Sequence, residues 1–213
     1  MTCLSSLIDD LTTPLVPDTS VLINLHACSF GEQVLRAIPN DIVVPEIVVS
    51  ELENETSYAN GENGFIRRLI VAKVVKVVEL NDPANEVFET LISGRGSLDD
   101  GEAATIAVAA ASGFRPVIDE RKGRARADGL MRGHPVAWSL DLLIHPEVQA
   151  ALPNRGHIEA VHLALREGRM RIDEDRCEAV AMLIGLERAL NCTSLPNYKI
   201  RKQRWAEILR ESS

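Results

Sequence analysis

Short aliphatic runs alternate with helical patterns along the first two thirds of the chain. The runs cover residues 15–17, 42–44, 74–78, 115–119 and 135–138. The run at 74–78 is dense in β-branched residues, which is typical of strands. Apolar residues at helical spacing, or strong helix formers, predict helices over residues 19–28, 46–53, 85–92 and 103–112. This alternation predicts an α/β fold with a parallel sheet, in which sites form at the carboxyl ends of the strands.

Local signals at the ends of these elements support the assignment. Pro17 favours an extended chain before it, so Asp18 stands at a strand-to-helix turn. Gly113 ends the alanine-rich helix at 103–112. The polar, glycine-bearing residues 54–64 instead predict a loop or a frayed helix end.

The chain divides by composition into three parts: an N-terminal tail (1–14), an α/β domain (15–150) and a mainly helical C-terminal extension (151–213). Within the extension, residues 177–190 are amphipathic, and residues 197–210 form a basic stretch around Trp205. We expect both stretches to pack on the domain or to form contacts in a homo-oligomer.

The composition is that of an ordinary globular protein, since 46% of the 213 residues are hydrophobic and 25% are charged. No run approaches the roughly 18 apolar residues that a membrane span needs. Asp9 and Asp10 stand where a secretory signal would be apolar, so we expect a cytoplasmic protein with no membrane partner. The net charge of -8 disfavours approach to RNA or DNA, so a nucleic-acid enzyme would need local basic patches and metal ions.

The cysteines and histidines indicate no metal or redox site. Cys3, Cys28, Cys177 and Cys192 are widely separated and form no CxxC pair, so we interpret them as buried hydrophobic residues or free thiols. The histidines lack ligand spacing, and structural or surface roles are expected for them.

Carboxylates stand where the expected sheet would present a site. Asp18 and Asp119 each follow a strand, and Glu102 lies in the first turn of a helix, where the macrodipole tolerates negative charge. Glu51 lies at the edge of the inward-facing stripe of its helix. Acids that converge without cationic partners repel one another, so a hard divalent cation, Mg²⁺ or Mn²⁺, is the natural compensation. The fourth acid is either Asp119 or its neighbour Glu120.

Each acid also has an ordinary structural explanation. Asp18 could simply cap a helix, and Glu102 could be the third residue of a capping box that starts at Asp99. Glu51 alone would be a solvated helix residue, and the Asp119–Glu120 pair a turn. The functional interpretation rests on their joint placement, because independent surface acids need not all fall at strand-to-helix junctions or inward edges.

Four motifs resemble those of the PIN-domain family of nucleases, whose members include the toxins of bacterial toxin–antitoxin pairs. They are VPDTSVLI at 16–23, VPEIVVSEL at 44–52, DDGEAATIA at 99–107 and VIDERKGR at 117–124. The last two resemble a branch of the family with a DxGE motif and an acidic pair before KGR. The resemblance covers residues 15–172.

This resemblance implies a three-layer α/β sandwich, with a central parallel sheet and helices on both faces, followed here by the helical extension. It also implies a Mg²⁺- or Mn²⁺-dependent endonuclease that acts on RNA. Its metal-binding and catalytic residues would be Asp18, Glu51, Glu102, and Asp119 or Glu120. If the chain is a toxin, an antitoxin protein is an expected partner.

Other residues are candidates for supporting roles. Ser20 and Asp100 would orient the metal ligands, although Ser20 is equally explained as a helix cap. RNA would be held by the basic residues of and after the fourth motif, Arg121, Lys122, Arg124 and Arg126. The C-terminal stretch would add Lys199, Arg201, Lys202 and Arg204. A solvated charged face is the alternative for both basic sets.

The main rival function is a non-catalytic PIN-like module that binds RNA or a protein without cutting. Other acid-bearing α/β classes fit less well. A haloacid-type phosphatase needs Asp-x-Asp, whereas Asp18 is followed by Thr19 and Ser20, and a Rossmann domain needs a glycine fingerprint that this sequence lacks. Metal-dependent cleavage of labelled RNA separates the nuclease from the binding module.

Overall fold

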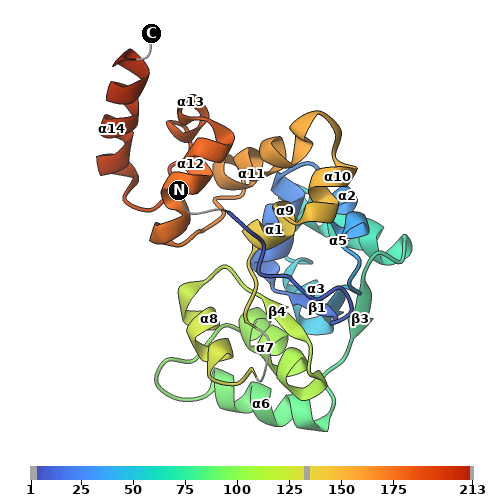
Figure 1. The fold of residues 1–213 in the computed structure, drawn as a ribbon. Helices are drawn as coiled ribbons and strands as arrows, with labels where there is room; N and C mark the ends of the chain where they lie inside the picture. Colours follow the sequence, from blue (N-terminus) through green and yellow to red (C-terminus); the bar gives the residue numbers. More distant parts are fainter. Residues whose placement is uncertain (1–3, 132–134, 212–213) are drawn as a thin grey trace.

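In the computed structural model, which describes residues 4–131 and 135–211, short strands lie side by side and parallel (Figure 1). They are β1 (Leu15–Pro17), β2 (Val43–Pro45), β3 (Lys76–Val78) and β4 (Arg115–Val117). β1 pairs with β4 and β2 with β3, and a bridge between Leu15 and Ile42 joins the pairs in the order β3-β2-β1-β4. A bridge from Val117 to Ala137 extends the β4 edge.

Helices connect and cover these strands. Those of the first part are α1 (Thr19–Ala27), α2 (Gly31–Ala37), α3 (Glu46–Glu51), α4 (Glu55–Asn60), α5 (Glu62–Val71), α6 (Asp82–Ile92), α7 (Asp100–Ser112) and α8 (Arg121–Asp128). Those that follow are α9 (Ser139–Leu143), α10 (Pro146–Ala151), α11 (Gly156–Arg166), α12 (Cys177–Ile184), α13 (Leu186–Ala189) and α14 (Tyr198–Glu211), with short 3₁₀ turns at Pro153–Arg155 and Glu174–Arg176.

Successive side chains of β1 point to opposite faces of the sheet, and both faces are covered. Leu15 belongs to the apolar cluster that contains Leu22 and Leu25 of α1, whereas Val16 packs in a second cluster with Val108 of α7. In Figure 1, α1, α2 and α5 lie above the strands, and α6 and α7 lie below them. The predicted α/β sandwich with a parallel sheet and a helical C-terminal part is confirmed.

The prediction of a loop or frayed helix end at residues 54–64 was wrong, because this stretch contains α4 and the start of α5. The Asn54 side chain caps α4 by accepting a hydrogen bond from Ser57 N at 2.8 Å. Gly61, with φ +86°, ends α4 and turns the chain into α5. The polar and glycine residues of this stretch therefore reflect solvent exposure and the two caps of α4, Asn54 and Gly61.

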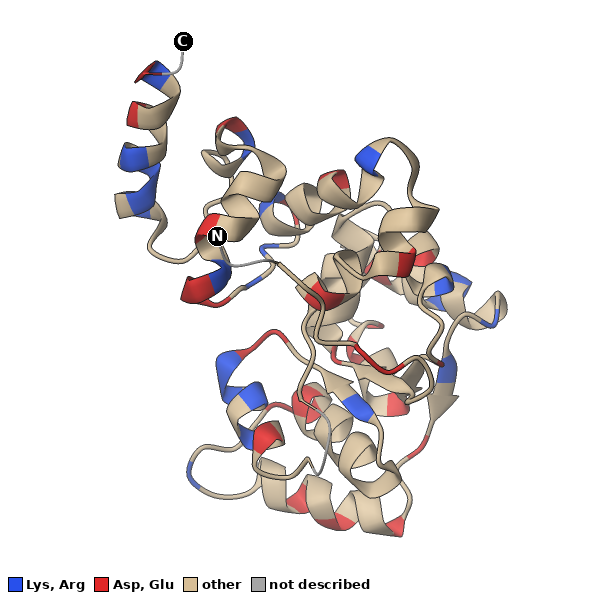
Figure 2. Cartoon of the chain, in the orientation of Figure 1, with Lys and Arg blue, Asp and Glu red and all other residues tan. Residues whose placement is uncertain are grey.

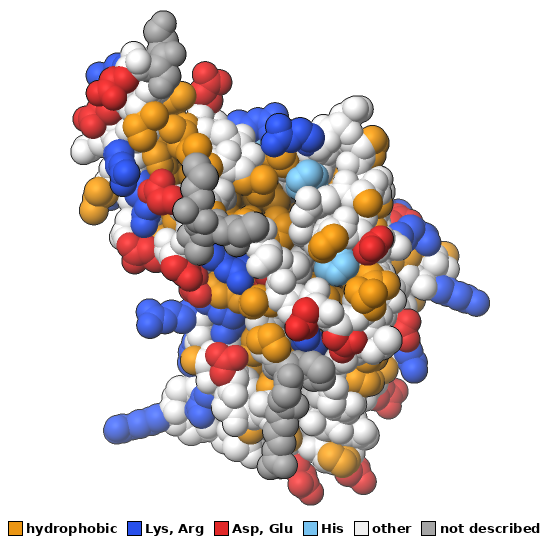
Figure 3. All heavy atoms as spheres, viewed as in Figure 1, with side chains coloured by type: hydrophobic (Ala, Val, Ile, Leu, Met, Phe, Trp, Pro, Cys, Tyr) orange, Lys and Arg blue, Asp and Glu red, His pale blue; other side chains and the backbone are white. Residues whose placement is uncertain are grey.

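The C-terminal part shares the core of the α/β part. Val161 and Leu165 of α11 lie in the same apolar cluster as Leu22 of α1, and Trp205 of α14 is fully buried in it. Figure 3 shows apolar atoms gathered beside this end of the chain. The proposed division at residues 150/151 stays a prediction.

Buried charged residues hold the N-terminal segment against the domain. Asp141, fully buried, accepts hydrogen bonds from Leu7 N and Trp138 N at 3.0 Å and pairs with Arg176 at 3.0 Å. Arg115 pairs with Asp9 at 2.8 Å. These contacts therefore anchor Leu7 and Asp9, before β1, on the domain.

The cysteine interpretation is confirmed for the thiols that the structure describes. Cys28, Cys177 and Cys192 are buried and free, and burial raises their pKa values to about 12, 11 and 11, while Cys3 lies outside the described residues. Across residues 4–131 and 135–211, no helix is both long and apolar enough to span a membrane.

Candidate metal centre

Asp18 lies where β1 ends and α1 begins, and it is almost fully buried. Its Oδ1 accepts hydrogen bonds from Val21 N and from Ser20 Oγ, both at 2.8 Å, so Asp18 caps α1. Burial and then the charge of Asp119 raise the pKa of Asp18 well above its usual range, with a smaller contribution from Glu102. Capping uses one carboxylate oxygen, so it is compatible with a metal-binding role for the other.

Glu102 lies in the first turn of α7, where its backbone N donates to Asp99 Oδ1 at 2.8 Å. Its carboxylate is packed against Gly123 of α8, and its Oε1 has no hydrogen-bond partner among the described residues. Burial and then the charges of Asp99 and Glu120 raise the pKa of Glu102 to about 7. An unpartnered buried carboxylate oxygen is a natural position for a cation.

Glu51, at the end of α3, reaches the N-terminus of α7. Its Oε1 accepts a hydrogen bond from Gly101 N at 2.8 Å, and its Oε2 accepts one from the Thr19 hydroxyl. A Cβ at position 101 would lie 2.2 Å from Glu51 Oε2, so any other residue would displace this carboxylate. The glycine of the DxGE motif therefore allows Glu51 to approach α7.

Asp119 follows β4 and is almost fully buried. Ser139 donates to it twice, from its backbone N to Oδ1 at 2.8 Å and from its hydroxyl to Oδ2 at 2.6 Å. Asn24 of α1 donates from Nδ2 to Oδ2 at 2.6 Å. Burial raises the pKa of Asp119 to about 6, although these donors oppose the shift. They also fix the orientation of the carboxylate, as the outer partners of metal ligands do.

Glu120 lies further out than Asp119. Its Oε2 accepts a hydrogen bond from Arg171 Nη1 at 2.6 Å, and both side chains are partly exposed. Asp119, Glu120 and Arg171 contribute to the lining of a hollow of about 230 Å³. Asp119 is therefore the interior acid of the pair and Glu120 the outer one, and both stay candidate ligands.

Glu102 links the acids electrostatically, because its charge interacts with those of Asp18, Glu51 and Glu120. As the side chains stand, no three His, Cys, Asp or Glu residues between 4 and 131 or between 135 and 211 lie close enough together to hold a metal ion. The donor set still suits a hard divalent cation, because it consists of carboxylates and because Glu102 Oε1 lacks a partner in the described part of the chain. Side-chain movements would be needed for binding.

The predicted supporting residues lie in different surroundings. Ser20 donates to Asp18, whereas Asp100 is exposed at the first position of α7, where no hydrogen bond of its side chain is seen in the described chain. Arg121, Lys122 and Arg126 are exposed on α8, which carries a run of basic positions in Figure 2. In the C-terminal stretch, Arg201 pairs with Glu174 and Glu178.

Arg124 points into the protein, unlike its basic neighbours on α8. Its Cζ lies 3.4 Å from the centroid of the Trp138 ring, and its Nη2 lies 3.0 Å from Asp173 Oδ1. Its Nη1 donates to the carbonyl oxygen of Asp119. This placement differs from the prediction that Arg124 holds RNA, because its charge is already satisfied inside the fold.

Sequence reasoning missed Asn24 and Ser139, the two residues that orient Asp119. Asn24 is a polar residue beside apolar Val21, Leu22 and Leu25 in a buried helix face, and that contrast was the available signal. Ser139 follows the β-like run 135–138, so it stands at the end of a strand-like segment, as Asp18 and Asp119 do. The contacts themselves link residues 95 and 20 positions apart.

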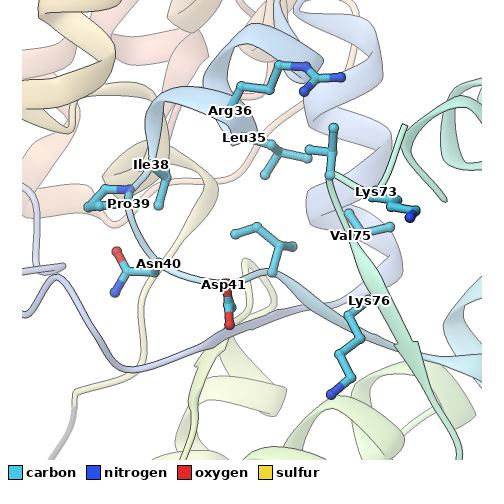
Figure 4. A pocket seen from close by; sticks show the side chains of 11 residues that line it. Leu35, Arg36, Ile38, Pro39, Asn40, Asp41, Lys73, Val75 and Lys76 are labelled. Atoms are coloured by element: carbon cyan, nitrogen blue, oxygen red, sulfur yellow. The ribbon is translucent and has the colours of Figure 1, made fainter. Parts of the chain in front are cut away.

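A second hollow, of about 510 Å³, lies at the opposite edge of the sheet (Figure 4). Its lining includes Asp41 and Ile42 before β2, and Lys73 and Val75 before β3. The strands are parallel, so this hollow faces away from their carboxyl ends, where the acids gather. Asp41 is its only carboxylate among the described lining residues, which gives it no comparable metal-binding chemistry.

Comparisons with known proteins identify the family of this chain. The DUF3368 family, described as a PIN domain, matches residues 14–186. No curated protein matches the chain. One similar solved structure is the crystal structure of PAE2754 from Pyrobaculum aerophilum, which is 20% identical, with a TM-score of 0.38 over 59% of this chain and 89% of that one.

Proposed function

Because the chain belongs to the DUF3368 family of PIN domains, we propose that it is a metal-dependent endoribonuclease that hydrolyses RNA phosphodiester bonds. PIN domains are generally nucleases, and they generally use divalent metals. One observation carries the proposal: Asp18, Glu102 and Asp119 are buried acids with raised pKa values at the carboxyl edge of a parallel sheet. Such a group costs stability by itself and is stabilised by a divalent cation.

The acids that would hold Mg²⁺ or Mn²⁺ are Asp18, Glu51, Glu102, and Asp119 or Glu120. The ion would supply Lewis-acid chemistry, because it acidifies water and offsets the negative charge that builds on the phosphoryl oxygens. Asn24 and Ser139 keep Asp119 oriented towards the site, and Ser20 does the same for Asp18. These donors limit the rearrangement that binding requires.

RNA would approach along the exposed basic side chains of α8. Arg121, Lys122 and Arg126 begin immediately after the acidic pair, so they offer positive charge beside a site that is itself negative. This local patch would offset the net charge of -8, which otherwise repels a polyanion.

Cleavage of a labelled RNA oligonucleotide by the purified protein tests the proposal. We expect cleavage with Mg²⁺ or Mn²⁺, none with EDTA, and none by Glu102→Gln, since an amide binds a hard cation more weakly than a carboxylate does. Glu89→Gln is the matched control, because Glu89 is exposed on α6 and has no hydrogen-bond partner among the described residues. RNA binding without cleavage under every metal condition would favour the non-catalytic module instead.

A toxin role and a homo-oligomer are two further parts of the proposal, and each has its own test. If the nuclease is a toxin that acts in the cytoplasm, its expression should arrest growth, Glu102→Gln should relieve the arrest, and an antitoxin protein should restore growth when co-expressed. If the chain forms a homo-oligomer, its mass by light scattering should exceed that of the 23.4 kDa chain.

A further inference from the structure

The segment that follows α11 lies beside the acidic site. Gly168, Arg169 and Arg171 from this segment line the hollow of about 230 Å³ together with Asp119 and Glu120 from the end of β4. Figure 2 shows basic positions on the chain between α11 and α12 as well as on α8. Two arginines from a part of the chain outside the sheet therefore border the proposed metal centre.

Gly168 holds this segment tightly against α1. A Cβ at position 168 would lie 2.5 Å from Asn24 Oδ1 and 2.9 Å from the carbonyl oxygen of Ala164, so only glycine fits. The same Asn24 donates to Asp119 from its Nδ2. The position of the segment is therefore coupled to the acidic site through a single side chain.

Arg169 occupies a backbone conformation that favours glycine. Its φ is +58°, and the helix end around it is closed by a hydrogen bond from Met170 N to Ala164 O at 2.9 Å. Helices commonly place glycine at this point, because other L-residues are strained there. The Arg169 side chain is exposed, and it has no ion-pair or hydrogen-bond partner among the described residues. Arg169 is thus an unpaired cation in a strained backbone conformation beside an acidic site, which indicates that its side chain binds a ligand.

Arg171 has a partner that a phosphate could replace. Its ion pair with Glu120 measures 2.6 Å, and the two side chains are 65% and 36% exposed. Exposed ion pairs contribute little net stability, so an incoming anion can displace Glu120. The planar guanidinium fork matches two phosphate oxygens as well as it matches a carboxylate.

We propose that Arg169 and Arg171 bind RNA phosphates next to the scissile bond, with Arg171 exchanging Glu120 for a phosphate when RNA enters. This inference rests on the proposed nuclease function. It gives the acidic site a second set of basic side chains besides those of α8, supplied by the segment after α11. Glu120, once released, would be free to turn towards the metal.

Arg169→Gly tests whether Arg169 binds RNA. The control is a second arginine with a similar positive φ. Arg155 is also exposed and has φ +59°, but it lies at the start of α11 outside this hollow. Both Arg169→Gly and Arg155→Gly should raise the melting temperature, because each relieves a left-handed backbone. Only Arg169→Gly should weaken binding of a labelled single-stranded RNA in EDTA, measured by fluorescence anisotropy at several salt concentrations. Its salt slope should fall by about 0.7, the value for one neutralised phosphate.

Glu120→Gln tests the exchange at Arg171. This variant should bind the same RNA more tightly than wild type in EDTA, because Arg171 is no longer held by a charge. In an Arg171→Ala background, Glu120→Gln should give no such gain over Arg171→Ala alone. If the double variant gains as much affinity over Arg171→Ala as Glu120→Gln gains over wild type, loss of a negative charge alone explains the gain and the proposed exchange is wrong.

Binding and cleavage separate this inference from the nuclease proposal. Wild-type RNA affinity and salt slope in Arg169→Gly, or no RNA binding by the wild type, would overturn the inference even if the protein cleaves RNA. Weakened binding by Arg169→Gly but not by Arg155→Gly would support it even if no metal yields cleavage.

Discussion

The carboxylate of Glu102 packs against the backbone of Gly123, which has no side chain to push it away. A Cβ built at position 123 would lie 2.9 Å from Glu102 Oε1 and 3.0 Å from its Cδ. The glycine of the KGR sequence thus lets α8 approach α7 closely at Glu102, whose Oε1 has no hydrogen-bond partner among residues 4–131 and 135–211. Substitution at Gly123 can therefore move Glu102 without changing any charge.

We expect Gly123→Ala to displace the Glu102 carboxylate and to weaken metal binding. Alanine favours a helix over glycine by about 1 kcal/mol, which offsets part of the steric cost, so the fold should survive. The rise in melting temperature on adding Mg²⁺ or Mn²⁺ should shrink, since a ligand stabilises only the state that binds it. Gly129→Ala is the control, because the nearest atom to its new Cβ would lie 3.6 Å away. Equal metal-induced shifts in both variants would contradict the prediction.

Asp18→Asn should separate the capping role of Asp18 from its role in the metal centre. Asparagine caps a helix about as well as aspartate, so α1 should stay intact. The variant also removes a buried charge that repels Asp119. In EDTA it should therefore unfold within about 1 kcal/mol of wild type, on the more stable side, while losing cleavage and most metal-induced stabilisation. Retained cleavage with a wild-type metal shift would mean that Asp18 is only a cap.

Stability in EDTA should depend on pH through Glu102. Its pKa is raised from 4.5 to about 7 in the folded protein, so the folded state holds this proton more tightly than the unfolded state. The resulting stabilisation is complete below about pH 4.5 and is lost as the pH rises through about 7. Urea unfolding at about pH 5 and about pH 8 should show a smaller difference for Glu102→Gln than for wild type. An identical difference would argue against the raised pKa.

Ser139→Ala should change the pKa of Asp119 without replacing any acidic residue. The variant loses the hydroxyl that donates to Oδ2 at 2.6 Å, which should cost about 1 to 2 kcal/mol of stability. With one donor fewer, the pKa of Asp119 should rise above about 6, so stabilisation by Mg²⁺ should begin at a higher pH. Ser194→Ala is the control, because it removes a hydroxyl bonded to Leu165 O outside the site. A pH profile that moves equally in both variants would rule out a specific role for Ser139.

Substitution of Arg124 should lower stability, whereas substitution of the exposed basic residues of α8 should weaken RNA binding. Arg124→Ala removes the stacking on Trp138 and the pair with Asp173, so we expect about 2 kcal/mol of destabilisation in urea unfolding. Joint neutralisation of Arg121, Lys122 and Arg126 should change stability by only about 0.5 kcal/mol per site. It should lower the salt slope of RNA binding by about 0.7 for each phosphate that is no longer neutralised. An unchanged slope would identify these side chains as solvated surface.

The sequence by itself determined the local elements, because their causes are local. The short aliphatic runs predicted β1 to β4 in the part of the chain that the structure describes, and Gly113 ends α7 as expected, with φ +69°. Helix capping by Asp18 and by Asp99 was the structural alternative that their neighbours in the chain offered, and both side chains do accept those hydrogen bonds. The order of the acids along the chain also predicted that they lie at one edge of the sheet.

The tertiary structure decided which atoms surround each acid, because those contacts join residues far apart in the chain. No local pattern shows that Asn24 and Ser139 donate hydrogen bonds to Asp119, or that Glu102 Oε1 has no donor within residues 4–131 and 135–211. The basic run after β4 looks uniform in sequence, yet helix geometry turns Arg124 towards Trp138 and leaves its neighbours exposed. The Arg171–Glu120 pair spans 51 positions. Side-chain environment is set by which segments pack together, and packing is a property of the whole fold.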